Sequence, residues 1–102
     1  MEKEQSLCKE KKRVELREPK RYKVVFHNDD ITTVEFVVKV LTLLFFKTKT
    51  EAESLTLQIH FEGSAIVGIY SYDIAQSKTQ KTIQMAREEG FPLQVTVEPE
   101  DN

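Results

Sequence analysis

The chain has 102 residues, a formal net charge of −2 and 39% hydrophobic residues, which is the size and composition of one globular domain. No apolar run approaches the roughly 20 residues that a membrane-spanning helix needs, and the first residues lack the apolar core of a signal peptide. A single cysteine, Cys8, cannot form an internal disulfide or build a structural zinc site alone. We therefore expect a cytoplasmic protein.

The charges are unevenly distributed along the chain. Residues 1–20 carry seven Lys or Arg and five Asp or Glu, whereas residues 21–102 carry eight and twelve. Nucleic-acid binding depends on neutralising phosphates, so an acidic domain with a tail of mixed sign is poorly suited to it. We expect a monomer that binds neither nucleic acid nor membrane.

The N-terminal segment, residues 1–19, is predicted to be a flexible extension. The stretch from Lys9 to Arg13 is nearly all charged, and the segment has too few apolar residues to offset the entropy lost on ordering. The core domain is expected over residues 20–98, followed by a frayed acidic end at residues 99–102.

The core opens with a predicted strand over residues 22–27, where apolar side chains alternate. Asn and Asp at positions 28–30 favour a turn that ends it. Thr32, followed three residues later by Glu35, has the spacing of a capping box, so a helix is expected to begin there and to end near Lys47.

A second helix is predicted from Thr50, again with capping-box spacing, to the helix-ending Gly63. A β-branched strand follows at residues 65–70, then a third helix capped by Ser71, and a last strand at residues 93–97. The order strand, helix, helix, strand, helix, strand predicts an α+β fold. We expect a two-layer domain in which a three-stranded antiparallel sheet packs against three helices.

The densest polar cluster spans residues 27–30, where the first strand gives way to a helix. It is either a turn that caps the helix or a site for a cation, since carboxylate and amide oxygens are hydrogen-bond acceptors, and a protonated amine is the simplest such ligand. His60, beside apolar residues, is either a structural histidine or a ligand-binding one. A zinc site of His27, His60 and a carboxylate has no recognised metal-ligand spacing.

Catalytic motifs are absent from the sequence. It contains no G-x-S-x-G, P-loop or H-E-x-x-H pattern, and Cys8 lies in the predicted extension, away from an orienting histidine. We therefore predict that the protein is not an enzyme and uses neither a metal nor another cofactor.

Several motifs resemble the ClpS adaptor family, and together they cover about residues 20–97. The Asn-Asp-Asp turn combined with the later His-x-x-Gly is the specific pair. The matching segments are Arg21–Asp30 with Thr32 and Glu35–Val38, then Gln58–Gly63, Gly68–Tyr70, Ala75–Lys78 and Pro92–Leu93.

This resemblance implies a non-enzymatic adaptor. ClpS proteins bind substrates that carry a bulky N-terminal residue and hand them to the ClpA or ClpC unfoldase of the Clp protease. The implied ligand is a free α-amino group followed by a Leu, Phe, Tyr or Trp side chain. The alternative is a structural protein-interaction domain like the C-terminal domain of the ribosomal stalk protein, and fold alone does not separate the two.

The resemblance also assigns roles to residues. Val34 and Thr56 stand where the family commonly has Met, so the side-chain preference, and whether it extends to Ile or Val, stays open. Thr33 stands where the family often has Pro, and the capping box should tolerate this difference. The extension would help to pass substrates to the unfoldase. The implied residues are Asn28, Asp29, Asp30 and His60 for the α-amino group, Thr32 for the first peptide group, Ile31, Val34, Val37, Thr56, Ile59 and Leu93 for the apolar pocket, and Asp73 and Lys78 for docking on the N-terminal domain of the unfoldase.

Overall fold

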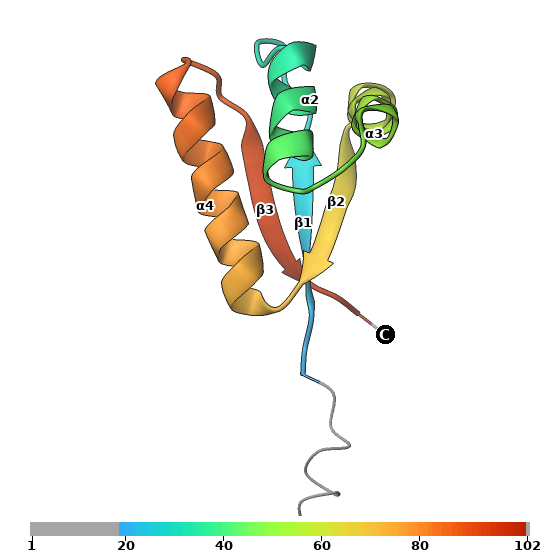
Figure 1. Ribbon diagram of the computed structural model, residues 1–102, viewed down its shortest axis with the longest axis vertical. Helices are drawn as coiled ribbons and strands as arrows, with labels where there is room; N and C mark the ends of the chain where they lie inside the picture. The colour runs from blue at the N-terminus through green and yellow to red at the C-terminus, as the bar shows by residue number, and fades with distance from the viewer. Residues whose placement is uncertain (1–18, 102) are drawn as a thin grey trace, which may run out of the picture.

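The structure, a computed structural model, describes residues 19–101 (Figure 1). The predicted extension, residues 1–19, lies almost entirely outside them, as does Cys8. The element order confirms the predicted α+β fold. The elements are β1 (Tyr22–His27), α2 (Val34–Leu43), α3 (Lys49–Glu62), β2 (Ser64–Tyr70), α4 (Tyr72–Glu88) and β3 (Gln94–Pro99). Within the described residues, no helix has both the length and the apolar character needed to cross a membrane.

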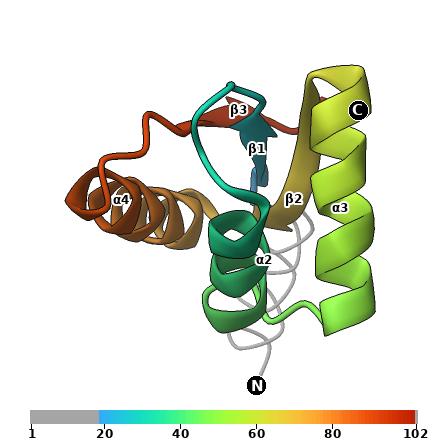
Figure 2. The same cartoon turned by 90° about the horizontal axis from the view of Figure 1, so that it is seen from above.

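The sheet has the order β2-β1-β3, and β1 pairs antiparallel with both neighbours. All three helices lie on one face of the sheet, with α2 between the other two (Figure 2). Val24 and Phe26 of β1 point to that face and are fully buried against the helices. The central strand therefore carries the middle of the core and ends, after His27, beside the helix layer.

The first two helices begin at different residues from those predicted. The N-cap of α2 is Thr33, whose hydroxyl oxygen accepts a hydrogen bond from the Phe36 backbone N–H, because the hydroxyl of the predicted cap, Thr32, is bonded to Asp29. The N-cap of α3 is Thr48, not Thr50. The sequence offers two overlapping capping boxes there, and the earlier one forms.

The first helix also ends earlier than predicted. Leu44 rather than Lys47 follows its last turn, and Phe46 then adopts a left-handed backbone conformation with φ of 56°. A third expected cap, Ser71, occupies the N-cap position of α4 but makes no side-chain capping hydrogen bond.

The C-terminal end is ordered further than predicted. The last strand runs to Pro99, and the Glu100 N–H then donates to the Arg21 carbonyl. The Arg21 guanidinium also binds the Glu100 carboxylate through two hydrogen bonds of 2.9 and 3.1 Å. The expected frayed end at residues 99–102 is therefore wrong at its first two positions, because the ladder with β1 continues there.

Candidate functional site

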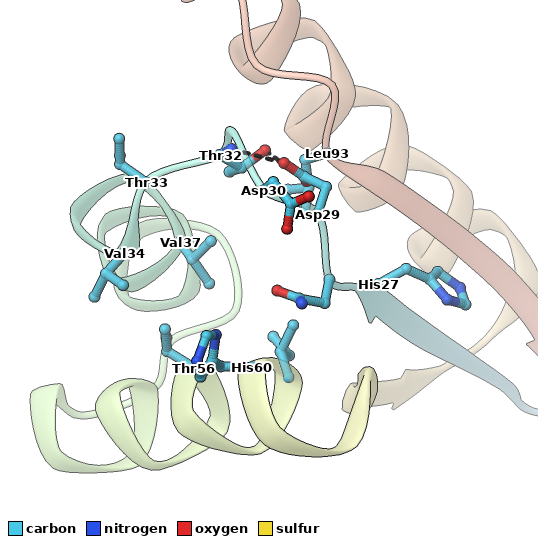
Figure 3. Close-up of a pocket in the computed structure, with 12 residues that line it drawn as sticks. His27, Asp29, Asp30, Thr32, Thr33, Val34, Val37, Thr56, His60 and Leu93 are labelled. Carbon is cyan, nitrogen blue, oxygen red and sulfur yellow. Dashed lines mark hydrogen bonds between the residues drawn. The ribbon is translucent and has the colours of Figure 1, made fainter.

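A pocket of about 260 Å³ lies where β1 ends, between the turn that follows it, α2 and α3 (Figure 3). This volume is just below the roughly 300–1,000 Å³ of small-molecule sites, so it suits one amino-acid side chain. Ile31 is not among the lining residues and is 62% exposed. The lining residues are His27, Asn28, Asp29, Asp30, Thr32, Thr33, Val34, Val37, Thr56, Ile59, His60 and Leu93.

Backbone geometry at Gly63 joins two walls of the pocket. Gly63 ends α3 in the left-handed conformation, with φ of 93°, which glycine adopts without steric cost. Its carbonyl accepts a 2.9 Å hydrogen bond from the Asn28 N–H. This bond holds the turn after β1 against the end of α3, so Asn28 and His60 line the same pocket.

Asp29 organises the turn. One carboxylate oxygen accepts the N–H groups of Ile31 and Thr32, at 2.8 and 2.7 Å, and the other accepts the Thr32 hydroxyl at 2.8 Å. Partial burial raises the pKa of Asp29, but these hydrogen bonds and the positive charge of Arg87 together lower it below its ordinary value of 3.8. Asp29 is therefore a charged structural element of the turn.

Three other polar side chains at the pocket are uncommitted, meaning that they make no hydrogen bond with the described residues. Asn28, Asp30 and His60 make no side-chain hydrogen bond with any residue in the described range 19–101, and all three are exposed at the pocket. The His60 ring packs edge-on against Phe61, with the ring centres 4.9 Å apart. An amide oxygen, a carboxylate and an imidazole nitrogen are thus available as acceptors for a ligand's N–H groups.

Four apolar side chains form another part of the lining. Val37, Ile59 and Leu93 are buried members of the core, whereas Val34 is 61% exposed. Val34 and Val37 both lie on α2 (Figure 3). The buried Thr56 donates its hydroxyl to the Ala52 carbonyl at 2.7 Å, so this polar group is already satisfied within α3. An apolar side chain can therefore enter the pocket without leaving the buried Thr56 hydroxyl unpaired.

Sequence reasoning did not assign Thr33 or His27 to the lining. Thr33 lines the pocket because it, not Thr32, caps α2. The His27 ring points away from the pocket, and its Nε2 lies 2.8 Å from the Thr96 hydroxyl (Figure 3). The structure thus does not bring the two histidines together. Within residues 19–101, no three His, Cys, Asp or Glu side chains are placed to hold a metal ion.

The two predicted docking residues lie on α4, outside the pocket lining. Asp73 is exposed in the first turn of this helix. Lys78 is half-buried: its ammonium donates to the Leu44 carbonyl and lies 4.7–5.6 Å from the ring centres of Phe45, Phe46 and Tyr70. Lys78 is therefore part of the packing between α4 and the segment that follows α2.

Comparison with known proteins places this geometry in a family. The family model described as ATP-dependent Clp protease adaptor protein ClpS matches residues 17–96. The chain belongs to the ClpS family. The resemblance predicted from the sequence is thereby confirmed.

Curated ClpS relatives match most of the chain. The ATP-dependent Clp protease adapter protein ClpS of Acetivibrio thermocellus is 43% identical over 97 residues, covering 95% of this chain and 98% of the relative. The protein of the same name from Nautilia profundicola is 48% identical over 85 residues, covering 83% and 88%.

A solved ClpS structure shares the fold. The structure of Agrobacterium tumefaciens ClpS2 bound to L-phenylalaninamide has a TM-score of 0.79 and 40% sequence identity to this chain, and it covers 81% of this chain and 100% of that one. That ligand has a free α-amino group and a bulky apolar side chain.

Proposed function

We propose that the chain is a non-catalytic adaptor that binds the N-terminal residue of substrate proteins and delivers them to a Clp unfoldase. The observation that carries this function is one pocket that combines an apolar wall, formed by Val34, Val37, Ile59 and Leu93, with three side chains that are free to accept hydrogen bonds. An N-terminal residue has the matching chemistry, because it joins a side chain to a charged ammonium group. An internal residue lacks the ammonium.

The ammonium would be bound by the uncommitted side chains. The Asn28 side-chain oxygen and a neutral ring nitrogen of His60 accept its hydrogen bonds, and Asp30 supplies a negative charge beside them. Asp29 acts indirectly, since both of its carboxylate oxygens are used within the turn. The two adjacent aspartates therefore have different roles: Asp30 attracts the ligand's ammonium group, whereas Asp29 stabilises the turn.

The side chain of the first residue would enter between Val37, Ile59 and Leu93. Burying a Leu, Phe, Tyr or Trp side chain there is favourable, by about 1.5–3 kcal/mol for a residue such as Leu or Phe. Thr32 donates its hydroxyl hydrogen to Asp29, so its oxygen remains free to accept the next peptide N–H of the substrate.

Delivery would use a different face. Asp73 is exposed at the start of α4, and Lys78 lies one and a half turns further along the helix. We propose that this region docks on the N-terminal domain of a ClpA- or ClpC-type unfoldase, and that residues 1–19 help to pass the substrate on.

The test is titration with a fluorescent peptide that begins with Phe, against the same peptide N-acetylated. The free peptide should bind and the acetylated one should not. Asn28→Ala and His60→Ala should each weaken binding by about 2–5 kcal/mol, since each removes an acceptor from a desolvated ammonium. Gln58→Ala is the matched control, because Gln58 is an exposed residue of the same helix as His60 and does not line the pocket.

Equal binding of both peptides, or binding of neither, contradicts the proposal. Normal Phe-peptide affinity in folded Asn28→Ala and His60→Ala proteins would contradict the assignment of these two residues. Circular dichroism of each variant establishes that it is folded.

A further inference from the structure

Arg87, in the last turn of α4, holds the loop that leads into β3. One guanidinium nitrogen, Nη1, donates to two carbonyl groups, those of Phe91 and Leu93, at 2.9 Å each. Pro92, between them, has no N–H with which to stabilise the loop itself. A single side chain therefore fixes the backbone on both sides of this proline.

The same loop is tied to the core at its other end. The Phe91 N–H donates to the Ala86 carbonyl at 2.8 Å, and its ring packs edge-on against Phe36 of α2, with ring centres 5.2 Å apart. Leu93 is 1% exposed and lines the pocket. The position of its side chain thus depends on a short loop held between α4 and α2.

Arg87 also affects Asp29, which belongs to the turn after β1 and lines the same pocket. Burial raises the pKa of Asp29, and the positive charge of Arg87 is among the influences that lower it. Since Asp29 binds the backbone of the turn at Ile31 and Thr32, this charge favours the ionised form that holds the turn. Arg87 therefore has a connection to two pocket walls although it is not itself a lining residue.

We propose that Arg87 is a positioning residue of the pocket, which fixes the Leu93 side chain by binding the Phe91 and Leu93 carbonyls together. The inference rests on the proposed function in one respect: Leu93 contacts the first side chain of the bound peptide. Arg87 would then set side-chain selectivity from outside the pocket, without touching the ligand.

The experiment compares the full chain with Arg87→Met, which keeps an extended apolar side chain but removes every donor. Lys81→Met is the matched control, because Lys81 is an exposed cation of α4 that makes no hydrogen bond or ion pair within the described residues. Dissociation constants are measured for peptides that begin with Phe and with Leu. The methyl signals of Leu93 are recorded by NMR without ligand.

In Arg87→Met we expect both peptides to bind about tenfold more weakly, the scale of one lost methylene-sized contact. The ratio of the two dissociation constants should also change, and the Leu93 methyl signals should move. Lys81→Met should resemble the parent chain in all three respects. A smaller folded fraction would weaken both peptides by the same factor, so the ratio separates positioning from general destabilisation.

An unchanged ratio together with unchanged Leu93 methyl signals would overturn the role of Arg87. If the parent chain bound neither peptide, the proposed function would fail instead. The methyl signals would still decide whether Arg87 positions Leu93, because they need no ligand.

Discussion

Two neighbouring carboxylates at the pocket differ in how their hydrogen-bonding capacity is used. Asp29 accepts three hydrogen bonds from its own turn, whereas Asp30 accepts none from residues 19–101. The sequence shows only two adjacent aspartates. They differ in the folded protein because the backbone N–H and the hydroxyl of Thr32 both donate to Asp29. Substitutions at the two positions should therefore have different consequences.

Asp29→Asn should destabilise the fold at neutral pH by about 1–2 kcal/mol, because charge-assisted hydrogen bonds are replaced by neutral ones and the Thr32 hydroxyl loses its acceptor. The pKa of Asp29 is lowered on folding, so its contribution is fully present above the ordinary value of 3.8 and is lost as pH falls through the folded value. Urea unfolding between about pH 7 and pH 2.5 should show a smaller acid loss of stability in the variant. Parallel pH curves would contradict the role of Asp29.

Val34 offers a second test at the scale of one residue. It is exposed at the pocket, and the buried Thr56 lines the same pocket. Val34→Met should narrow the opening and disfavour peptides that begin with Ile or Val relative to Leu, by about 1–3 kcal/mol at most. Peptides beginning with Leu, Phe, Ile and Val would be titrated against both proteins. An unchanged Leu-to-Ile ratio would show that Val34 does not control access.

Among the elements, α2 depends on a neighbouring helix for its C-terminal end. Its final turn is followed by Phe46, 79% exposed in a left-handed conformation, and the Leu44 carbonyl is bound by Lys78 of α4. A cation near the C-terminus of a helix is also favoured by the helix dipole. Lys78 thus substitutes for the glycine that commonly ends a helix.

Lys78→Met should lower the free energy of unfolding by about 1–3 kcal/mol, through loss of a charged hydrogen bond and of contacts with three aromatic rings. Asp73→Ala should change it by less than about 0.5 kcal/mol, as expected for an exposed surface position. Chemical denaturation of both variants provides the comparison. Equal stability of the two would show that the Lys78 contacts contribute nothing measurable.

Sequence patterns predicted which elements exist better than where they begin and end. Alternation in β1 and helical spacing in α2 and α4 are clear signals, since they reflect burial against one core. In α3 the apolar spacing is weak, and its capping-box spacing and Gly63 are the better signals. The caps were harder, because Thr32 competes with Thr33, and Thr48 with Thr50, for the same role. The choice within each pair depends on side-chain contacts such as the bond from Thr32 to Asp29.

The pocket was predictable largely through family resemblance. Of the eleven residues that it implied for ligand binding, ten line the pocket, and the exception is Ile31. Composition and spacing alone did not decide between a ligand-binding role and a structural role for the Asn-Asp-Asp turn and for His60. Arg87 gave no signal in the sequence, because its role depends on two backbone carbonyls that only the folded loop brings together.

In the whole molecule, the pocket and the proposed docking region lie at opposite ends. The turn after β1 is at the upper end of the domain in Figure 1, whereas α4 begins at the lower end. An unfoldase domain bound near Asp73 would therefore leave the pocket open. A substrate could remain bound while the adaptor docks.

Asp73→Ala should accordingly keep the parent affinity for a Phe-initiated peptide and slow degradation of a Phe-initiated substrate by the unfoldase and its protease. Since the substitution removes a small exposed carboxylate, the fold should be unaffected. Peptide titration and a degradation assay on one preparation measure the two effects. A parallel loss of peptide affinity would mean that the two regions are not independent.

The pocket draws its walls from three distant parts of the chain: the turn and helix after β1, the end of α3, and Leu93. Leu93 directly precedes β3, which pairs with β1 and completes the sheet. A folding chain in which β3 has not yet paired with β1 therefore lacks a fixed Leu93 wall of the pocket. The turn, α2 and α3 therefore cannot form a complete pocket by themselves, and binding at this site requires the whole sheet to be assembled.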